Sequence, residues 1–183
     1  MRKVDTKRPR IHFHATSVGE WEQAVPIIDK LKAQNPDLFI SISFFSPSGY
    51  KFAKNYPNID LKVYLPLDRY KPAKQFFSIL KPQLWIISKF DVWPNHVIAA
   101  HKLNIPVAIT AATLSADSKR NKGISKFFNR YIYKKIDYLF PISADDKSRF
   151  LELFPYPDKI SITGDTRFDR VHQRGEKAKN AGN

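Results

Sequence analysis

The sequence predicts a doubly wound α/β fold with a mainly parallel sheet. Short apolar runs alternate along the chain with stretches of helical period, a strand–helix–strand rhythm. Most of these runs are apolar throughout, as expected for strands covered by helices on both faces. The chain has 183 residues, 43% of them hydrophobic, which suffices for one such domain and is too few for two ordinary ones.

Seven strands are expected, and the segments between them have helical spacing. In chain order the strands cover residues 11–15, 39–45, 61–65, 84–88, 107–112, 138–142 and 160–163. Between the third and fourth strands, an apolar stripe on one helix face is formed by Tyr70, Ala73, Phe76, Phe77 and Leu80. Pro26 suits only the first turn of a helix or a kink, so Glu20 is expected on a loop or in a short initial turn.

The loops that follow the strands are the candidate site, because ligands of doubly wound sheets bind beyond the carboxyl ends of the strands. These loops are distinctive in sequence. In chain order they read Thr16-Ser17-Val18-Gly19-Glu20, Ser46-Pro47-Ser48-Gly49, Pro66-Leu67-Asp68, Lys89-Phe90-Asp91-Val92-Trp93-Pro94-Asn95 and Gly164-Asp165-Thr166-Arg167-Phe168-Asp169.

Glu20 is the candidate general base. A carboxylate directly after the first strand points toward the ligand edge, where it can accept a proton from an attacking hydroxyl. The alternative is that Glu20 only favours a helix N-terminus electrostatically. Gly19 and Gly49 also have a structural alternative, since both would suit turn conformations that are open to Gly.

Several classes of site are disfavoured or excluded. The chain has no Cys, which excludes disulfides, thiolate metal sites and Cys nucleophiles. It has neither a dinucleotide-binding G-x-G-x-x-G nor a phosphate-binding G-x-x-x-x-G-K-[ST]. His12 and His14 stand on one face of a strand at a spacing that a metal could use, but no further ligand cluster accompanies them, so we favour packing or substrate contact.

An anionic partner is expected, because 31 Lys and Arg face 17 Asp and Glu, a formal charge of +14. A basic stripe lies beside Phe127, Phe128 and Tyr131 on a predicted helix and consists of Lys122, Lys126, Arg130 and Lys134. This stripe is either a solvated face or a contact surface for phosphates or anionic lipid. Nucleic acid is not the expected partner, since no RRM, KH or helix-turn-helix signature is present.

No stretch approaches the roughly 18 to 20 apolar residues of a membrane span, and the start has no apolar secretion core, so a soluble chain is expected. We divide it into a basic lead at 1–9, one domain at 10–171 and a polar tail or linker at 172–183.

Taken in order, the strand-end loops resemble the N-terminal, acceptor-binding domain of the Kdo (3-deoxy-manno-octulosonic acid) transferases, which are two-domain GT-B glycosyltransferases. The most specific piece is HATSVGE at His14 to Glu20. Four further motifs agree in sequence and order, namely SPSG at 46–49, YLPLD at 64–68, WPN at 93–95 and GDTRFD at 164–169. The resemblance spans about residues 10–171 and implies that this Rossmann-like domain is one half of a GT-B fold.

The resemblance implies an inverting transfer of Kdo from CMP-Kdo to a lipid A precursor at the cytoplasmic face of the bacterial inner membrane, with Glu20 as the base and no cofactor. Arg167 matches a basic residue that supports the transition state. Lys89 stands where the family has an acidic residue, and Asp91 is the nearby carboxylate that compensates. Substrate contacts are expected from the basic stripe and from Ser17, Gly19, Ser48, Gly49, Asp91 and Asn95.

Members of the family usually begin with a hydrophobic anchor and continue into a second domain that binds most of the CMP-sugar. Neither pattern is present in these residues. We therefore expect the chain to fold alone but to be inactive without a donor domain. The alternatives are a non-catalytic module that binds anionic lipid and, less favoured, a nucleic-acid-binding domain.

Overall fold

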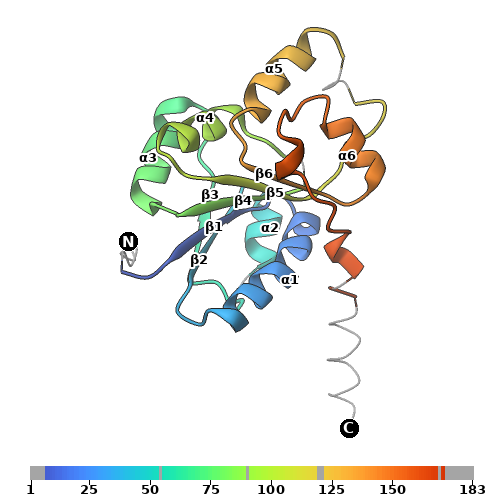
Figure 1. The fold of residues 1–183 in the computed structure, drawn as a ribbon. Helices are drawn as coiled ribbons and strands as arrows, with labels where there is room; N and C mark the ends of the chain where they lie inside the picture. Colours follow the sequence, from blue (N-terminus) through green and yellow to red (C-terminus); the bar gives the residue numbers. More distant parts are fainter. Residues whose placement is uncertain (1–6, 54, 90, 119–121, 169, 172–183) are drawn as a thin grey trace.

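The chain folds around a parallel sheet of six strands in the order β3-β2-β1-β4-β5-β6, with helices on both faces (Figure 1). The computed structural model describes residues 7–53, 55–89, 91–118, 122–168 and 170–171. The strands are β1 (Arg10–His14), β2 (Phe39–Phe44), β3 (Leu61–Tyr64), β4 (Leu84–Ser88), β5 (Val107–Ala112) and β6 (Tyr138–Pro141). The labelled helices are α1 (Val18–Gln34), α2 (Pro47–Phe52), α3 (Tyr70–Leu80), α4 (Pro94–Lys102), α5 (Gly123–Tyr133) and α6 (Ala144–Phe150), followed by a 3-10 turn at Pro157–Lys159. Residues 166–168 and 170–171 are helical too. The predicted doubly wound α/β fold is confirmed.

Two apolar cores flank the sheet. One lies under α1 and α2 and includes Trp21, Ile28 and Phe44. The other lies under α3, α4 and α5 and includes Phe77 and Trp85. Because both faces are covered, the central strands are buried along nearly their whole length, which explains why they read as continuous apolar runs.

The first six predicted strands are present, with ends that differ by at most one residue. The seventh, predicted at 160–163, is wrong. The segment runs beside β6 through one isolated bridge between Leu139 and Ile160 and a bond from Thr163 N to Pro141 O of 3.1 Å. Pro141 has no N–H with which to continue a ladder, and Gly164 turns the chain away at a φ of 78°.

Pro26 was expected in the first turn of a helix or at a kink; it lies inside α1, so the first of these two placements is wrong. Its ring removes the backbone N–H that would bond to the carbonyl of Glu22. The helix continues because Ala24, Val25 and Ile28 are buried against the sheet, and tertiary packing outweighs the local loss. Glu20 therefore lies in the first turn of a long helix.

The predicted lead and tail fall largely outside the described residues, which omit 1–6 and 172–183, and so do Phe90 and Asp169 of the loop motifs. Arg8, from the described part of the lead, donates to Asp60 Oδ1 at 3.1 Å and to Leu38 O at 3.1 Å. In the part of the chain that the structure describes, no helix is both long and apolar enough to cross a membrane.

Candidate functional site at the switch point of the sheet

The loops after β1 and β4 meet where the strand order reverses. Strand β1 pairs with β2 on one side and with β4 on the other. The chain after β1 turns to one face of the sheet, and the chain after β4 turns to the other (Figure 1). Open α/β sheets have their ligand crevice at this point, beyond the carboxyl ends of the strands.

Glu20 is fixed by a capping box at the start of α1. Its Oε2 accepts from the backbone N of Thr16 at 2.5 Å and from the backbone N of Ser17 at 3.3 Å, and Ser17 Oγ accepts from Glu20 N at 3.5 Å. The side chain is buried, with 8% of the residue exposed. The helix-stabilising role considered for Glu20 is therefore present, and it holds the carboxylate still at the switch point.

The surroundings of Glu20 favour its protonated form. Burial raises the pKa of the Glu20 carboxyl, and the negative charge of Asp91 raises it further. The N–H bonds from Thr16 and Ser17 and the positive charge of Lys89 act in the opposite direction and do not cancel the rise. A carboxylate with a raised pKa is a better proton acceptor, which suits a general base.

Asp91 and Lys89 bring opposite charges to the same place from the β4 loop. The Thr16 hydroxyl donates to Asp91 Oδ2 in a short contact. Lys89 adopts a left-handed φ of 71° directly after β4, and its backbone N donates to Thr110 O at 2.7 Å. A non-glycine residue held in this conformation is strained, and such strain is concentrated at functional sites. Asp91 thus lies near Glu20 and is linked to it through Thr16. That Asp91 compensates for the acidic residue that Lys89 replaces stays a prediction.

Helix α2 supports the site from the side. Ser46 caps it and donates its backbone N to Thr16 O at 3.2 Å, and Ser46 Oγ lies 2.6 Å from Ser48 Oγ. The turn interpretation of the two glycines is wrong, because neither Gly19 nor Gly49 has a positive φ. Gly49 instead allows a close approach: a Cβ on it would lie 2.8 Å from Phe44 Cδ1 and 3.4 Å from the backbone carbon of Ser17.

Arg167 is linked to α1 through Asp165. Its Nε and Nη2 both donate to Asp165 Oδ2, at 2.8 and 2.5 Å, and this pairing raises the pKa of the guanidinium. Asp165 Oδ1 accepts from Gln23 Nε2 at 3.3 Å, one helical turn after Glu20. Arg167 therefore lies on the Glu20 side of the sheet and is exposed. Two nitrogens of its guanidinium already donate to the Asp165 carboxylate.

Asn95 connects the loop after β4 to the loop after β3 by hydrogen bonds. Asp68 accepts from the backbone N of Asn95 at 3.0 Å and lies 3.0 Å from His96 Nδ1, and the Asn95 amide donates to Asp68 O at 2.9 Å. Asp68 thereby caps α4 without belonging to it. Burial would raise the pKa of Asp68, but the bonds from His96 and Asn95 outweigh it and lower that pKa. The YLPLD and WPN motifs thus pair with each other, and substrate contact by Asn95 stays a prediction.

His12 and His14 are fully buried and bonded to side chains of the neighbouring strand. His14 Nδ1 lies 2.9 Å from Ser43 Oγ, and His12 Nδ1 lies 2.9 Å from Ser41 Oγ. Burial lowers the pKa of His14 to about 3, and it lowers that of His12 well below the usual value. Among the described residues, no three or more His, Asp or Glu side chains are grouped as a metal would require.

The basic stripe lies on a separate element, α5. Lys122, Arg130 and Lys134 are exposed, whereas Lys126 pairs with Glu152 Oε2 at 2.7 Å. The adjoining apolar side chains are exposed too, which the amphipathic pattern did not predict: 88% for Ile124, 79% for Phe127, 53% for Phe128 and 51% for Tyr131. We call these four residues the apolar ridge of α5.

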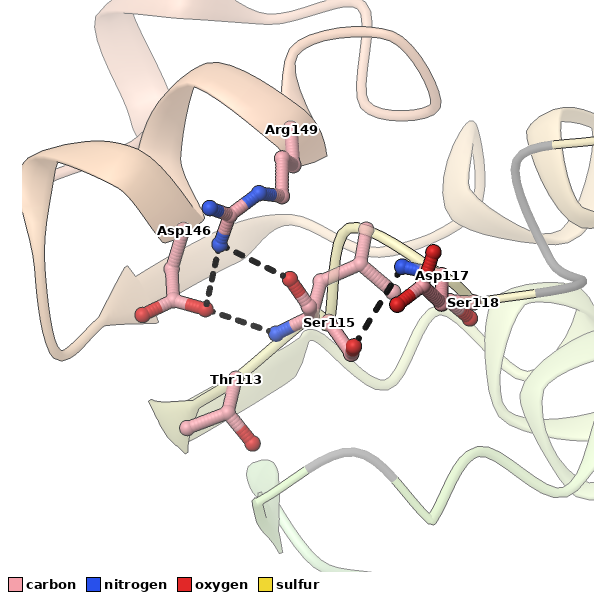
Figure 2. A pocket seen from close by; sticks show the side chains of 7 residues that line it. Thr113, Ser115, Asp117, Ser118, Asp146 and Arg149 are labelled. Atoms are coloured by element: carbon pink, nitrogen blue, oxygen red, sulfur yellow. Dashed lines mark hydrogen bonds and ion pairs between the residues drawn. The ribbon is translucent and has the colours of Figure 1, made fainter.

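A cavity of about 440 Å³ lies at the same sheet edge, between the loop after β5 and helix α6, and no sequence pattern indicated it (Figure 2). Asp146 Oδ1 accepts from the backbone N of Leu114 at 2.7 Å, and Arg149 Nη1 donates to Leu114 O at 3.2 Å. Thr113, Ser115 and Ser118 add hydroxyls to the lining. Asp146 and Arg149 thus hold the loop after β5 through the backbone of Leu114.

The sequence profile of a family described as 3-deoxy-D-manno-octulosonic-acid transferase (kdotransferase) matches residues 1–170. The chain belongs to the Kdo transferase family. It is 30% identical over 160 residues to the Kdo transferase of Haemophilus influenzae, which is 87% of this chain and 38% of that protein. It is 29% identical over 161 residues to a probable mitochondrial Kdo transferase of Arabidopsis thaliana, 86% of this chain and 36% of that protein. The chain thus spans less than two-fifths of these relatives and corresponds to the N-terminal domain of a Kdo transferase.

Solved structures of other proteins show the same fold. UDP-GlcNAc 2-epimerase from Neisseria meningitidis bound to UDP-GlcNAc matches with a TM-score of 0.69 at 19% identity, over 93% of this chain and 50% of that one. MurG from Acinetobacter baumannii matches with a TM-score of 0.59 at 15% identity, over 86% and 45%. This Kdo transferase domain is therefore one Rossmann-like half of a GT-B fold, as predicted.

Proposed function

We propose that this domain binds the acceptor in an inverting transfer of Kdo from CMP-Kdo to a hydroxyl of a lipid A precursor, with Glu20 as the general base. As the acceptor oxygen forms its bond to the anomeric carbon of Kdo, Glu20 takes the hydroxyl proton and CMP leaves with the electrons of the broken bond. The observation that carries this proposal is a buried carboxyl with a raised pKa at the switch point of a Kdo transferase domain.

The negative and positive charges near Glu20 have different proposed roles. The charge of Asp91 raises the pKa of Glu20 and so favours proton uptake by Glu20. Lys89 and Arg167 supply positive charge, which suits the phosphate and carboxylate of the donor. The proposed acceptor contacts are Ser17, Gly19, Ser48, Gly49 and Asn95. Most of the CMP-Kdo contacts, and with them transferase activity, are assigned to a second domain, and no cofactor is required.

The test joins this chain to the remainder of a Kdo transferase such as that of Haemophilus influenzae. Transfer from CMP-Kdo to a tetraacylated lipid A precursor is then compared between Glu20 and Glu20→Gln. Gln also completes a capping box, so the helix start is kept while the base is lost. We expect a loss of about 100-fold or more in kcat. Glu22→Gln makes the same chemical change two residues away and should leave transfer within a few-fold.

An active enzyme that is indifferent to Glu20→Gln would assign the base elsewhere. A folded but inactive joined enzyme that still binds lipid would favour the alternative of a non-catalytic module for anionic lipid.

We further propose that α5 contacts the anionic inner membrane surface on its cytoplasmic side. Exposed basic residues and the exposed apolar ridge share this one helix, and that combination is typical of helices that lie in the membrane interface. Lys122, Arg130 and Lys134 would meet lipid phosphates, and the apolar ridge would enter the acyl boundary. An apolar group of this kind on a soluble surface marks an interaction site.

This contact is measured by sedimentation with phosphatidylglycerol-containing vesicles. Changing Lys122, Lys126, Arg130 and Lys134 to Gln should weaken binding by about 1 kcal/mol per residue, with less from the paired Lys126. The matched control changes the exposed Lys30, Lys51, Lys71 and Lys74 to Gln, the same loss of charge on α1, α2 and α3. If the two sets weaken vesicle binding equally across a salt titration, the basic stripe is only a solvated face.

A further inference from the structure

A row of polar side chains crosses the buried middle of the sheet beneath the site. His12 and His14 stand in register with Ser41 and Ser43 of the adjacent strand. All four are buried, with at most 3% of each exposed. The row is covered by aromatic rings: Phe76 of α3 lies edge-on to His12 at 5.2 Å, and Trp93 lies edge-on to His14 at 6.2 Å.

We propose that this row is one continuous hydrogen-bond chain that ends on the Asp91 carboxylate, with every donor directed toward that end. In order, its members are Ser41, His12, Ser43, His14 and Thr16. The consecutive separations are 2.9 Å from Ser41 Oγ to His12 Nδ1, 3.0 Å from His12 Nε2 to Ser43 Oγ, 2.9 Å from Ser43 Oγ to His14 Nδ1 and 3.2 Å from His14 Nε2 to Thr16 Oγ1. The last bond runs from the Thr16 hydroxyl to Asp91 Oδ2. We call this set the polar chain.

The direction follows from counting protons. An ionised Asp91 can only accept, so the single Thr16 proton goes to Asp91, and Thr16 Oγ1 must accept from His14 Nε2–H. His14 is neutral because it is buried, so its Nδ1 has no proton and accepts from the Ser43 hydroxyl.

The same count continues along the strand pair. Ser43 has then used its one proton, so its oxygen accepts from His12 Nε2–H. His12 Nδ1 in turn accepts from Ser41. Two backbone carbonyls compete for the serine protons: Ser43 Oγ lies 3.4 Å from Phe13 O, and Ser41 Oγ lies 3.5 Å from Ile11 O. The shorter 2.9 Å separations from these hydroxyls to the histidine Nδ1 atoms favour the direction of the polar chain.

The polar chain gives both histidines a role as positioning residues for the proposed transfer, on which this inference rests. Aligned hydrogen bonds polarise one another in a low-dielectric interior, and here their positive ends all point to Asp91. They therefore present the positive end of an aligned row of hydrogen bonds to the Asp91 carboxylate. Thr16 connects this effect to the base, because its hydroxyl holds Asp91 while its backbone N–H holds Glu20 Oε2 at 2.5 Å.

The histidine tautomers report the direction of the polar chain without any assay of transfer. Long-range ¹H–¹⁵N spectra of the ¹⁵N-labelled 183-residue chain at neutral pH distinguish Nε2–H from Nδ1–H, and His12→Gln and His14→Gln variants assign the signals. We expect both residues to be neutral and protonated on Nε2. Either residue protonated on Nδ1 would overturn the proposal.

Thr16→Val is the deciding variant. Without the Thr16 hydroxyl, His14 Nε2–H would be a buried donor with no acceptor, which is costly. The direction of donation along the polar chain should therefore reverse. We expect His14 and also His12 to shift to Nδ1–H, although His12 does not contact Thr16. Thr16→Ser keeps the hydroxyl and should keep the wild-type tautomers. An unchanged His12 tautomer in folded Thr16→Val would show that the hydrogen bonds are independent of one another. That result would refute a continuous polar chain.

A failed transferase assay with the expected tautomers would overturn the proposed function and leave the polar chain in place, so the two failures are distinguishable.

Discussion

Replacement of Gly49 by Ala tests whether close packing, rather than turn geometry, determines this position. The new Cβ would lie 2.8 Å from Phe44 Cδ1, well inside van der Waals contact. Phe44 has no exposed surface and is held edge-to-face by Trp21 at 6.0 Å and Tyr50 at 6.3 Å, so it cannot swing away. Overpacking of this kind costs about 1–3 kcal/mol, and Ala offsets up to about 1 kcal/mol of it through helix propensity. We expect a net loss of about 1–2 kcal/mol in the free energy of unfolding.

The matched control is Gly19→Ala, in the first turn of α1. Its nearest neighbouring atom would be Ser17 Oγ at 4.0 Å, so the substitution should be neutral or stabilise the protein by up to about 1 kcal/mol. Urea unfolding followed by circular dichroism measures both variants. A Gly49→Ala protein as stable as the wild type, or equal changes at the two glycines, would refute the reasoning. Because the new Cβ would also lie 3.4 Å from the Ser17 backbone carbon, Gly49→Ala should also disturb the cap that holds Glu20.

Two further predictions concern buried polar groups. The pKa of His14 is about 3 in the folded chain against 6.5 when exposed, so the unfolded state binds more protons and stability falls as the pH drops below about 6.5, by about 1.4 kcal/mol per pH unit. His14→Gln should remove this slope from urea titrations between about pH 6.5 and 4.5, and parallel slopes for the two proteins would contradict it. Asp146→Ala leaves the Leu114 N–H without its acceptor and removes the partner of Ser143, which should cost about 1–3 kcal/mol. The exposed Asp145→Ala should change stability by less than about 0.5 kcal/mol, and similar losses at both positions would contradict a specific role for Asp146.

Strand positions were predictable because these strands are buried on both faces, and continuous apolar runs have few alternative structures. The failure at 160–163 has a different cause. Residues in that segment are apolar enough for a strand, but pairing depends on whether the neighbouring edge can donate, and Pro141 cannot. The position of Pro26 was also judged from a local preference alone. The preference of proline for a helix start does not measure how strongly the sheet holds α1.

The site was predictable at the level of loops and less so at the level of atoms. Glu20, Lys89 and Asp91 stand after strands β1 and β4, and a parallel sheet brings such ends together. No pattern in sequence indicated that Thr16 would hold both carboxylates, because a threonine is equally common as a simple turn residue. The exposed ridge on α5 was also hidden, since an amphipathic period says which residues share a face and not whether that face is covered.

The placement of the three tryptophans gives the site an internal fluorescent probe. Trp21 and Trp85 are 2% and 0% exposed, so a dissolved quencher cannot reach them in the folded chain. Trp93 is half-buried on the β4 loop, 4.7 Å from the Phe45 ring and beside His14. Emission that iodide can quench should therefore come from Trp93, and protection from iodide would follow acceptor binding at the switch point in the unmodified protein, without a label or a donor sugar.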